Sequence, residues 1–162
     1  MLVFDTSALI SLGVGDVLDP VLDELSVATT ALVWAELEET SGYDDRHGRA
    51  ARAVLECEPR LELVDVTGEA FVTSRIDAGE ASCVAAVRTL DAPFLITDDF
   101  RALPELQRLV DAEVALSPIV LRALVKRGAL SENEARTAFD AIAEGRDWLG
   151  APIYRYARRL FD

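Results

Sequence analysis

The chain has 162 residues, of which 51% are hydrophobic and 28% are charged, and its formal net charge is −13. A chain of this length folds as one domain as a rule, with a core that needs no disulfide or metal, and its composition excludes a disordered or fibrous protein. No apolar run reaches the roughly 18 residues of a membrane-spanning helix, and the N-terminus lacks the basic segment of a signal peptide. We therefore expect a cytoplasmic protein without membrane contact.

The acidic charge has two interpretations. Asp and Glu number 29 against 16 Lys and Arg, and Lys126 is the single lysine. Such a surface indicates either a basic partner or adaptation to high salt, and the even spread of acids along the chain favours a halophilic protein. At molar salt the Debye length is about 3 Å, so the net charge does not exclude a nucleic-acid substrate.

Cysteine and histidine are too few for common metal sites. Cys57 and Cys83 lie far apart and form no CxxC pair, so we expect two free, buried thiols. His47 is the single histidine, which excludes a multi-histidine site, and its polar surroundings predict a solvated loop.

Strand-like and helix-like segments alternate along the first part of the chain, which is typical of a parallel α/β sheet. In chain order the pattern predicts a buried strand at 1–4, a helix from Ala8 that Gly13 and Gly15 break and that resumes at 20–25, a strand at 26–30, helices at 31–40 and 46–57, a strand at 61–66 and a helix at 68–76.

The second part continues this alternation and then becomes helical. The pattern predicts a small-residue helix at 78–90, a buried strand at 94–97, a helix at 100–110, a strand at 113–116, and helices at 118–127, at 131–144 after a Ser131–Glu134 capping box, and from Pro152. We expect a single domain over 1–162 with a parallel sheet of about five strands, an α/β core at 1–116 and a helical extension at 117–162.

Acidic side chains follow the predicted strands. Ligands of open parallel sheets bind beyond the carboxyl ends of the strands, where Asp5, Asp98 and Asp99 stand. Glu36 lies just over a turn into the helix after the second strand, and Glu80 lies in the first turn of the small-residue helix. These acids are candidates for one cluster.

Helix capping explains the same acids in another way. Asp5 can cap the first helix, and Asp98 or Asp99 can cap the helix near Phe100. Asp77 and Glu80 have capping-box spacing. Both interpretations stay open, although capping does not require the acids to converge.

Three segments resemble the PIN domain (PilT N-terminus) nucleases, which include VapC-type toxins. They are VFDTSALISL, TTALVWAELEE and AGEASCVAAVRTLDAPFLITDDFRAL, and the later LVKRGALS resembles a PIN-like subfamily with Gly-Glu where many toxins have Asp. The short motifs match mainly through their order and spacing, over nearly the whole chain.

The resemblance implies a three-layer α/β/α fold and a metal-dependent ribonuclease that hydrolyses RNA phosphodiester bonds. By position, Asp5, Glu36, Glu80 and Asp98 match the family acids, Asp99 is a further metal ligand, and Thr6, Ser7 and Thr97 are hydroxyls beside them. A cluster of hard oxygen ligands suits Mg²⁺ or Mn²⁺. A VapC-type role implies an antitoxin partner and a homodimer.

Other readings stay open for the basic residues and for the function. Arg101, together with Arg155, Arg158 and Arg159, could hold an RNA backbone or balance surface acids. A PIN-like module that binds nucleic acid or protein without cleaving it is the main alternative. A receiver-like or phosphatase-like domain also uses Asp clusters, but Lys126 falls too late in the chain to serve one.

Overall fold

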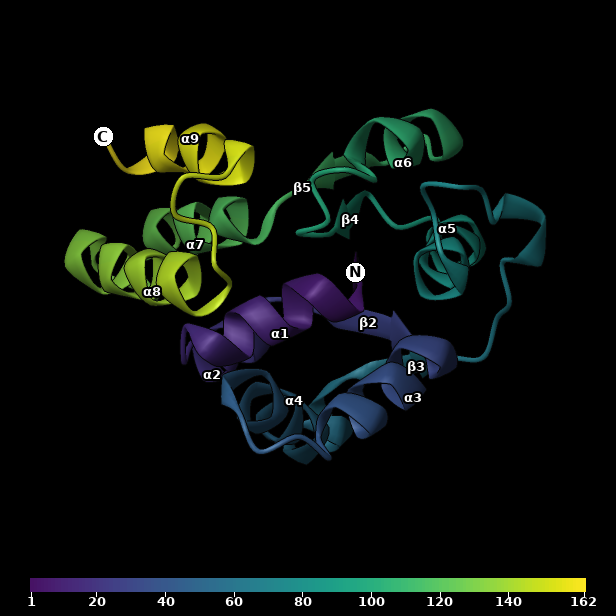
Figure 1. The fold of residues 1–162 in the computed structure, drawn as a ribbon, viewed down its shortest axis with the longest axis horizontal. Coiled ribbons are helices and arrows are strands. Elements are labelled where there is room, and N and C mark those ends of the chain that lie inside the picture. The colour runs from purple at the N-terminus through teal and green to yellow at the C-terminus, as the bar shows by residue number, and fades with distance from the viewer.

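Five parallel strands form one sheet in the order β3–β2–β1–β4–β5. A computed structural model describes residues 1–162 (Figure 1). The strands are β1 (Leu2–Phe4), β2 (Val27–Thr30), β3 (Glu62–Val64), β4 (Phe94–Ile96) and β5 (Glu113–Ala115). Val3 of the central strand pairs with Ala28 on one side and Leu95 on the other. This strand is apolar without alternation because helices cover both faces of the sheet.

Helices connect the strands and extend beyond them. The α-helices are α1 (Thr6–Val14), α2 (Leu18–Glu24), α3 (Ala31–Thr40), α4 (Arg46–Glu56), α5 (Ala78–Leu90), α6 (Leu103–Leu109), α7 (Ser117–Lys126), α8 (Glu132–Gly145) and α9 (Pro152–Arg158). Single 3₁₀ turns lie at Glu58–Arg60, Glu69–Phe71 and Arg159–Phe161. None of the helices is long and apolar enough to cross a membrane.

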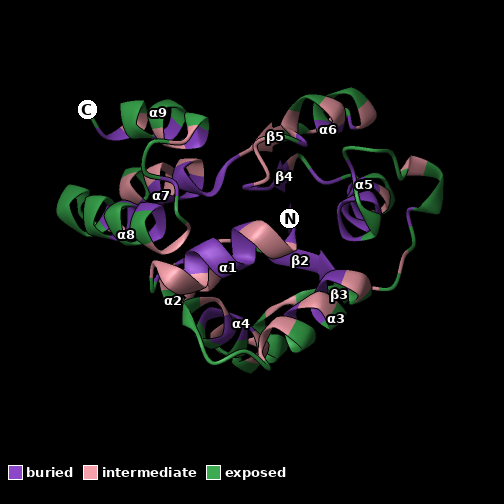
Figure 2. Cartoon of the chain, in the orientation of Figure 1, coloured by how far each residue is buried: buried purple, intermediate pink, exposed green.

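The helices make the outer two layers of an α/β/α fold, as expected. Helices α1, α3 and α4 pack against one another on one side, and α5 packs on β1, β2 and β4 from the other side. Helices α7 and α8 pack against α1, and Figure 1 shows α7, α8 and α9 grouped beside that layer. In Figure 2 much of α1 and α5 is buried, whereas α6, α8 and α9 have exposed outer faces.

Two predicted elements differ from the structure. Helix α1 does not break at Gly13 but continues to Val14. The missing side chain at Gly13 instead lets α4 approach closely, since a Cβ there would lie 3.0 Å from the Ala50 Cβ. The predicted helix at 68–76 is only the 3₁₀ turn Glu69–Phe71. Beyond it, the Thr73 Oγ1 accepts from the Arg75 N–H, a local bond that competes with helix formation.

The cysteines and the histidine are placed only partly as expected. Both thiols are free and Cys83 is buried, but Cys57 is only half-buried, so the burial predicted for Cys57 is wrong. His47 lies half-buried in the first turn of α4, with its Nε2 3.1 Å from the Gly145 carbonyl oxygen. The solvated loop predicted for His47 is wrong, because this residue is helical and contacts the end of α8.

Candidate active site

The strand order creates a crevice at the carboxyl edge of the sheet. The chain runs outward from β1 through β2 to β3, and then returns to place β4 on the other side of β1. Ligands of open parallel sheets bind at such a reversal, beyond the strand ends. Asp5 directly follows β1, and Asp98 and Asp99 follow β4 after one residue.

A pocket of about 440 Å³ opens at this edge, and half of its lining residues are acidic. The lining consists of Asp5, Thr6, Ser7, Ile10, Glu36, Glu39, Thr40, Tyr43, Asp77, Glu80, Asp99 and Arg146. Four of the predicted acids therefore meet in one pocket although they come from four segments. The predicted residues Thr97, Asp98 and Arg101 are outside the lining.

Asp5 is held by hydrogen bonds from the first turn of α1 and from Thr97, the residue after β4. Its Oδ1 caps α1 by accepting from the Ala8 N–H at 2.9 Å, and accepts from the Ser7 hydroxyl at 2.7 Å. Its Oδ2 accepts from the Thr97 hydroxyl. Burial raises the pKa of Asp5 to about 7, opposed by these three bonds and increased slightly by the charge of Asp98. The carboxyl is therefore fixed in place and costly to ionise.

Glu36 enters the pocket from α3, which Thr30 caps through a bond from the Val33 N–H at 3.1 Å. The Thr6 hydroxyl donates to its Oε2. Its carboxylate lies directly over the Cα of Gly79, where any Cβ would overlap it. Burial raises the pKa of Glu36, the bond from Thr6 lowers it, and the charge of Asp77 raises it further.

Glu80 serves both a helix and the pocket. The Asp77 side chain accepts from the Glu80 N–H at 2.9 Å, and the Glu80 Oε2 accepts from the Asp77 N–H at 3.0 Å, which completes a capping box on α5. Burial raises the pKa of Glu80 to about 9, and the neighbouring Asp99 carboxyl raises it as well. Two acids in contact compete for one proton unless a cation neutralises them.

The neighbours Asp98 and Asp99 point to different places. Asp98 is buried, and its two oxygens accept from the Ser117 N–H and hydroxyl, each at 2.7 Å, at the start of α7. Asp99 lines the pocket, and its Oδ1 accepts from the Arg101 and Ala102 N–H groups at 3.1 Å each. Successive residues of an extended segment face opposite ways, which explains why only one of the pair can face the pocket.

The capping and clustering interpretations are therefore compatible. Asp5 caps α1, and Asp77 with Glu80 caps α5, yet Asp5 and Glu80 still line the same pocket. The hydroxyls of Thr6, Ser7 and Thr97 each donate to a carboxylate, as their positions beside the acids suggested.

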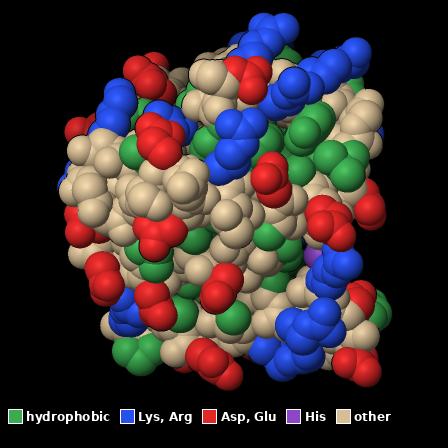
Figure 3. Space-filling model, turned by 90° about the vertical axis from the view of Figure 1, so that its left-hand side faces the viewer, with side chains coloured by type: hydrophobic (Ala, Val, Ile, Leu, Met, Phe, Trp, Pro, Cys, Tyr) green, Lys and Arg blue, Asp and Glu red, His purple; other side chains and the backbone are tan.

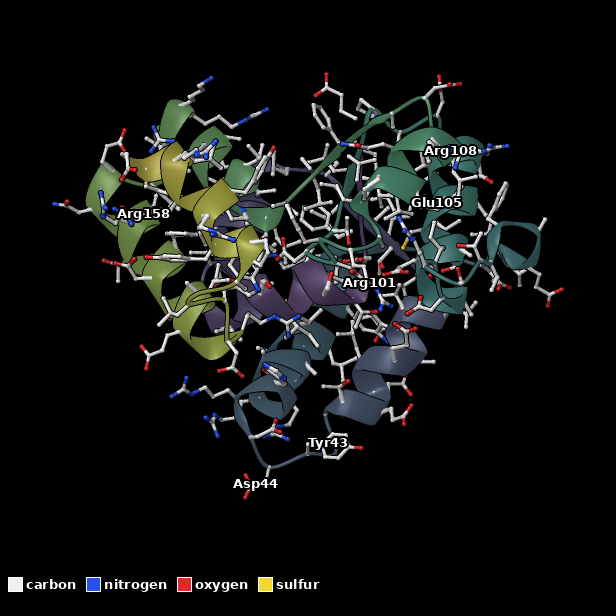
Figure 4. The ribbon with its side chains drawn as sticks, turned by 45° about the horizontal axis from the view of Figure 1, so that its top comes forward. Tyr43, Asp44, Arg101, Glu105, Arg108 and Arg158 are labelled. Carbon is white, nitrogen blue, oxygen red and sulfur yellow. The ribbon has the colours of Figure 1, made fainter.

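Some lining residues were missed in the sequence. Glu39 could have been found, because it lies one turn after Glu36 on the same helix face. Tyr43, in the loop between α3 and α4, and Arg146, at the end of α8, carried no local signal. Figure 4 shows Tyr43 on the loop at the lower edge, with Arg101 nearer the centre. Arg155, Arg158 and Arg159 are exposed and outside the pocket lining.

The donor set suits a hard divalent cation, although no three of the His, Cys, Asp and Glu side chains are arranged to hold a metal ion. Every acid at the site offers oxygen, and the Glu80–Asp99 contact is one that a cation relieves. Mg²⁺ commonly takes only one or two protein carboxylates and completes its shell with water and substrate phosphate. Asp5, Glu36, Glu80 and Asp99 are the residues that could hold it.

Comparison with known families agrees with this geometry. The family model described as "DUF3368: PIN domain" matches residues 1–162. The chain belongs to the PIN-domain family. The resemblance seen in the motifs is thereby confirmed, and a PIN domain is a nuclease-like module. No curated protein and no solved structure matches this PIN domain significantly.

Proposed function

We propose that this PIN domain is a Mg²⁺- or Mn²⁺-dependent ribonuclease that hydrolyses phosphodiester bonds. The observation that carries the proposal is the meeting of Asp5, Glu36, Glu80 and Asp99 in one pocket beside the reversal in strand order. Helix capping accounts for Asp5 and Glu80 but does not require four carboxyls to converge, and burying a carboxyl costs free energy.

The chain's own contribution is to hold the oxygen donors in place before substrate arrives. Asp5 is fixed by three hydrogen bonds, Glu36 by the Thr6 hydroxyl, and Glu80 by the Asp77 N–H. A divalent cation bound there supplies an activated water and stabilises the leaving oxygen. Because these side chains are already bonded in fixed positions, little rearrangement is needed on binding.

The direct test is cleavage of labelled single-stranded RNA with Mn²⁺ or Mg²⁺, against the same reaction with EDTA. Asp5→Asn and Glu36→Gln should abolish cleavage, whereas Asp140→Asn, an exposed acid on α8 outside the pocket, should not. DNA of the same sequence tests the preference for RNA. Metal-dependent binding without cleavage would replace the ribonuclease by the non-catalytic binding module.

The antitoxin and the homodimer that a VapC-type role implies are part of this proposal. Light scattering during size-exclusion chromatography tests the dimer, with a mass near twice 17.6 kDa as the expected result. A small open reading frame immediately upstream that encodes a DNA-binding protein would support a toxin role, and its product should inhibit cleavage.

A further inference from the structure

The acidic pocket contains a single basic side chain. Arg146 follows the last turn of α8, in the helical extension, and lines the pocket together with six acids from the α/β core. The remaining arginines and the lysine are outside the lining. A cation brought to this position from a separate part of the chain requires an explanation.

Salt bridges with the pocket acids do not explain the position of Arg146. Arg146 takes part in none of the ion pairs, all of which join other residues. The charges of Asp98 and Asp5 act on Arg146 and raise its pKa, but burial lowers the pKa more. The guanidinium is therefore near the carboxylates without being bonded to them.

The guanidinium has unused hydrogen-bonding capacity. Its Nε is buried and has no hydrogen-bond partner, the one side-chain nitrogen or oxygen in the protein of which this is true. Its Nη1 lies 3.5 Å from the His47 Nε2. The same Nε2 is 3.1 Å from the Gly145 carbonyl oxygen, and one ring nitrogen cannot both accept from Arg146 and donate to Gly145. A buried donor without a partner is costly and calls for a ligand that would satisfy it.

An oxyanion suits this guanidinium, which lines the pocket. Arginine presents a planar fork of N–H donors that matches two oxygens of a phosphate, and such charge-assisted bonds are strong where water is excluded. We infer that Arg146 binds a phosphate of the RNA backbone at this pocket and positions it against the acidic side. The inference rests on the proposed ribonuclease function. In this arrangement the helical extension binds the phosphate, and the acids of the α/β core hold the metal.

Loss of Arg146 should weaken RNA binding without weakening metal binding, and this difference is the test. Fluorescence anisotropy with a labelled uridine oligonucleotide of about ten residues, in Ca²⁺ to limit cleavage, reports RNA binding. Titration calorimetry with Mn²⁺ alone reports metal binding. Arg146→Gln should weaken oligonucleotide binding about 10- to 100-fold and leave Mn²⁺ affinity equal or higher, because a positive charge beside the cation is removed.

Two further variants give controls. Arg146→Lys keeps the charge but loses the fork, so it should recover only part of the binding. Arg127→Gln removes the same charge from the exposed end of α7, where the arginine makes only a 3.9 Å pair with Glu24, and should bind like the wild type. Thermal melts of all three variants check folding.

The outcomes separate the inference from the function on which it rests. Wild-type RNA cleavage with unchanged oligonucleotide binding by Arg146→Gln would refute the inference and leave the ribonuclease standing. An equal loss in Arg127→Gln would also refute it, since the effect would then be one of net charge. A wild-type protein that binds Mn²⁺ but neither binds nor cleaves RNA would refute both.

Discussion

The hydroxyl of Thr97, at the end of β4, donates a hydrogen bond to the Oδ2 of Asp5, at the end of β1. The same Oγ1 accepts from the Asp99 N–H at 3.1 Å. One buried hydroxyl thus joins the two neighbouring strand ends and orients both acids that follow them. The position of Asp5 depends on a residue 92 places later in the sequence.

Replacing Thr97 with valine should destabilise the protein by about 1–3 kcal/mol near pH 8, because a buried carboxylate loses a donor while the shape of the side chain is kept. The loss should be smaller near pH 5.5, where Asp5 is protonated. Thermal denaturation at the two pH values measures it. Thr97→Ser, which keeps the hydroxyl, is the control, and equal melting of both variants at both pH values would contradict the prediction.

The metal-free protein should be less stable at high pH. The pKa of Asp5 rises from 3.8 to about 7 on folding, so its contribution is present below its unfolded pKa and is lost as pH rises through 7. The difference amounts to about 4 kcal/mol over the whole range from pH 3.8 to 7, of which about 2 kcal/mol falls above pH 5.5. Glu80, raised to about 9, extends the loss to higher pH.

The measurement is the melting temperature in EDTA between about pH 5.5 and about pH 9. Asp5→Asn should flatten the curve and be at least as stable as the wild type at the alkaline end, because no buried charge then forms. Mn²⁺ should restore stability there. A melting temperature that rises with pH in EDTA would disprove this account.

Loss of the Asp98 side chain should lower the stability of the protein, whereas loss of the Asp99 side chain should lower its affinity for Mn²⁺. Asp98→Ala leaves the buried Ser117 N–H without a partner and should cost about 1–3 kcal/mol in the free energy of unfolding. Asp99→Ala should change stability little, because Arg101 is exposed and the Ala102 N–H also donates to the Asp99 carbonyl oxygen at 3.1 Å, and should weaken Mn²⁺ binding. A folded Asp98→Ala protein that has lost Mn²⁺ binding would instead restore Asp98 to the metal ligands that the family resemblance implies.

Gly79→Ala should weaken metal binding without harming the helix. Alanine favours α5 by up to about 1 kcal/mol, but its Cβ overlaps the Glu36 carboxylate and must displace it. We expect unchanged or higher stability in EDTA and lower Mn²⁺ affinity. In a Glu36→Ala background the same substitution should have no effect on Mn²⁺ affinity, because nothing remains to be displaced.

The salt response tests the acidic surface. If the charge of −13 reflects adaptation, folding and cleavage should both increase with KCl up to molar concentration, because self-repulsion is screened. Figure 3 shows acidic side chains scattered over one face, with basic ones most numerous at its upper right and lower right and others on its left side. Circular dichroism and RNA cleavage are followed together. A protein that is fully folded at low salt and loses activity steadily as KCl rises would favour a basic protein partner instead.

Local chemistry made most of the fold predictable. The bounds of α3 and α5 could be taken from the chain because Thr30 and Asp77 cap them, and the apolar run before Asp5 predicts β1. The helix predicted at 68–76 is wrong because this segment forms a 3₁₀ turn and then buries Ile76, rather than presenting one apolar helix face.

The site was less predictable than the fold. The predicted cluster of acids has four members in the lining of one pocket, but sequence position could not decide which of Asp98 and Asp99 faces that pocket. That choice depends on Ser117, which offers Asp98 two donors from α7. Arg146 was beyond reach, since its place depends on how the helical extension packs back on α1.

The helical extension is the last of these segments to be synthesised, since it follows the α/β core along the chain. All five strands and every pocket acid precede α7, α8 and Arg146 along the chain. Because a domain folds as one unit, we expect the acids to take their places only when α7 and α8 are available to pack on α1. If Arg146 is required to hold RNA, an incomplete nuclease cannot engage the message from which it is being made.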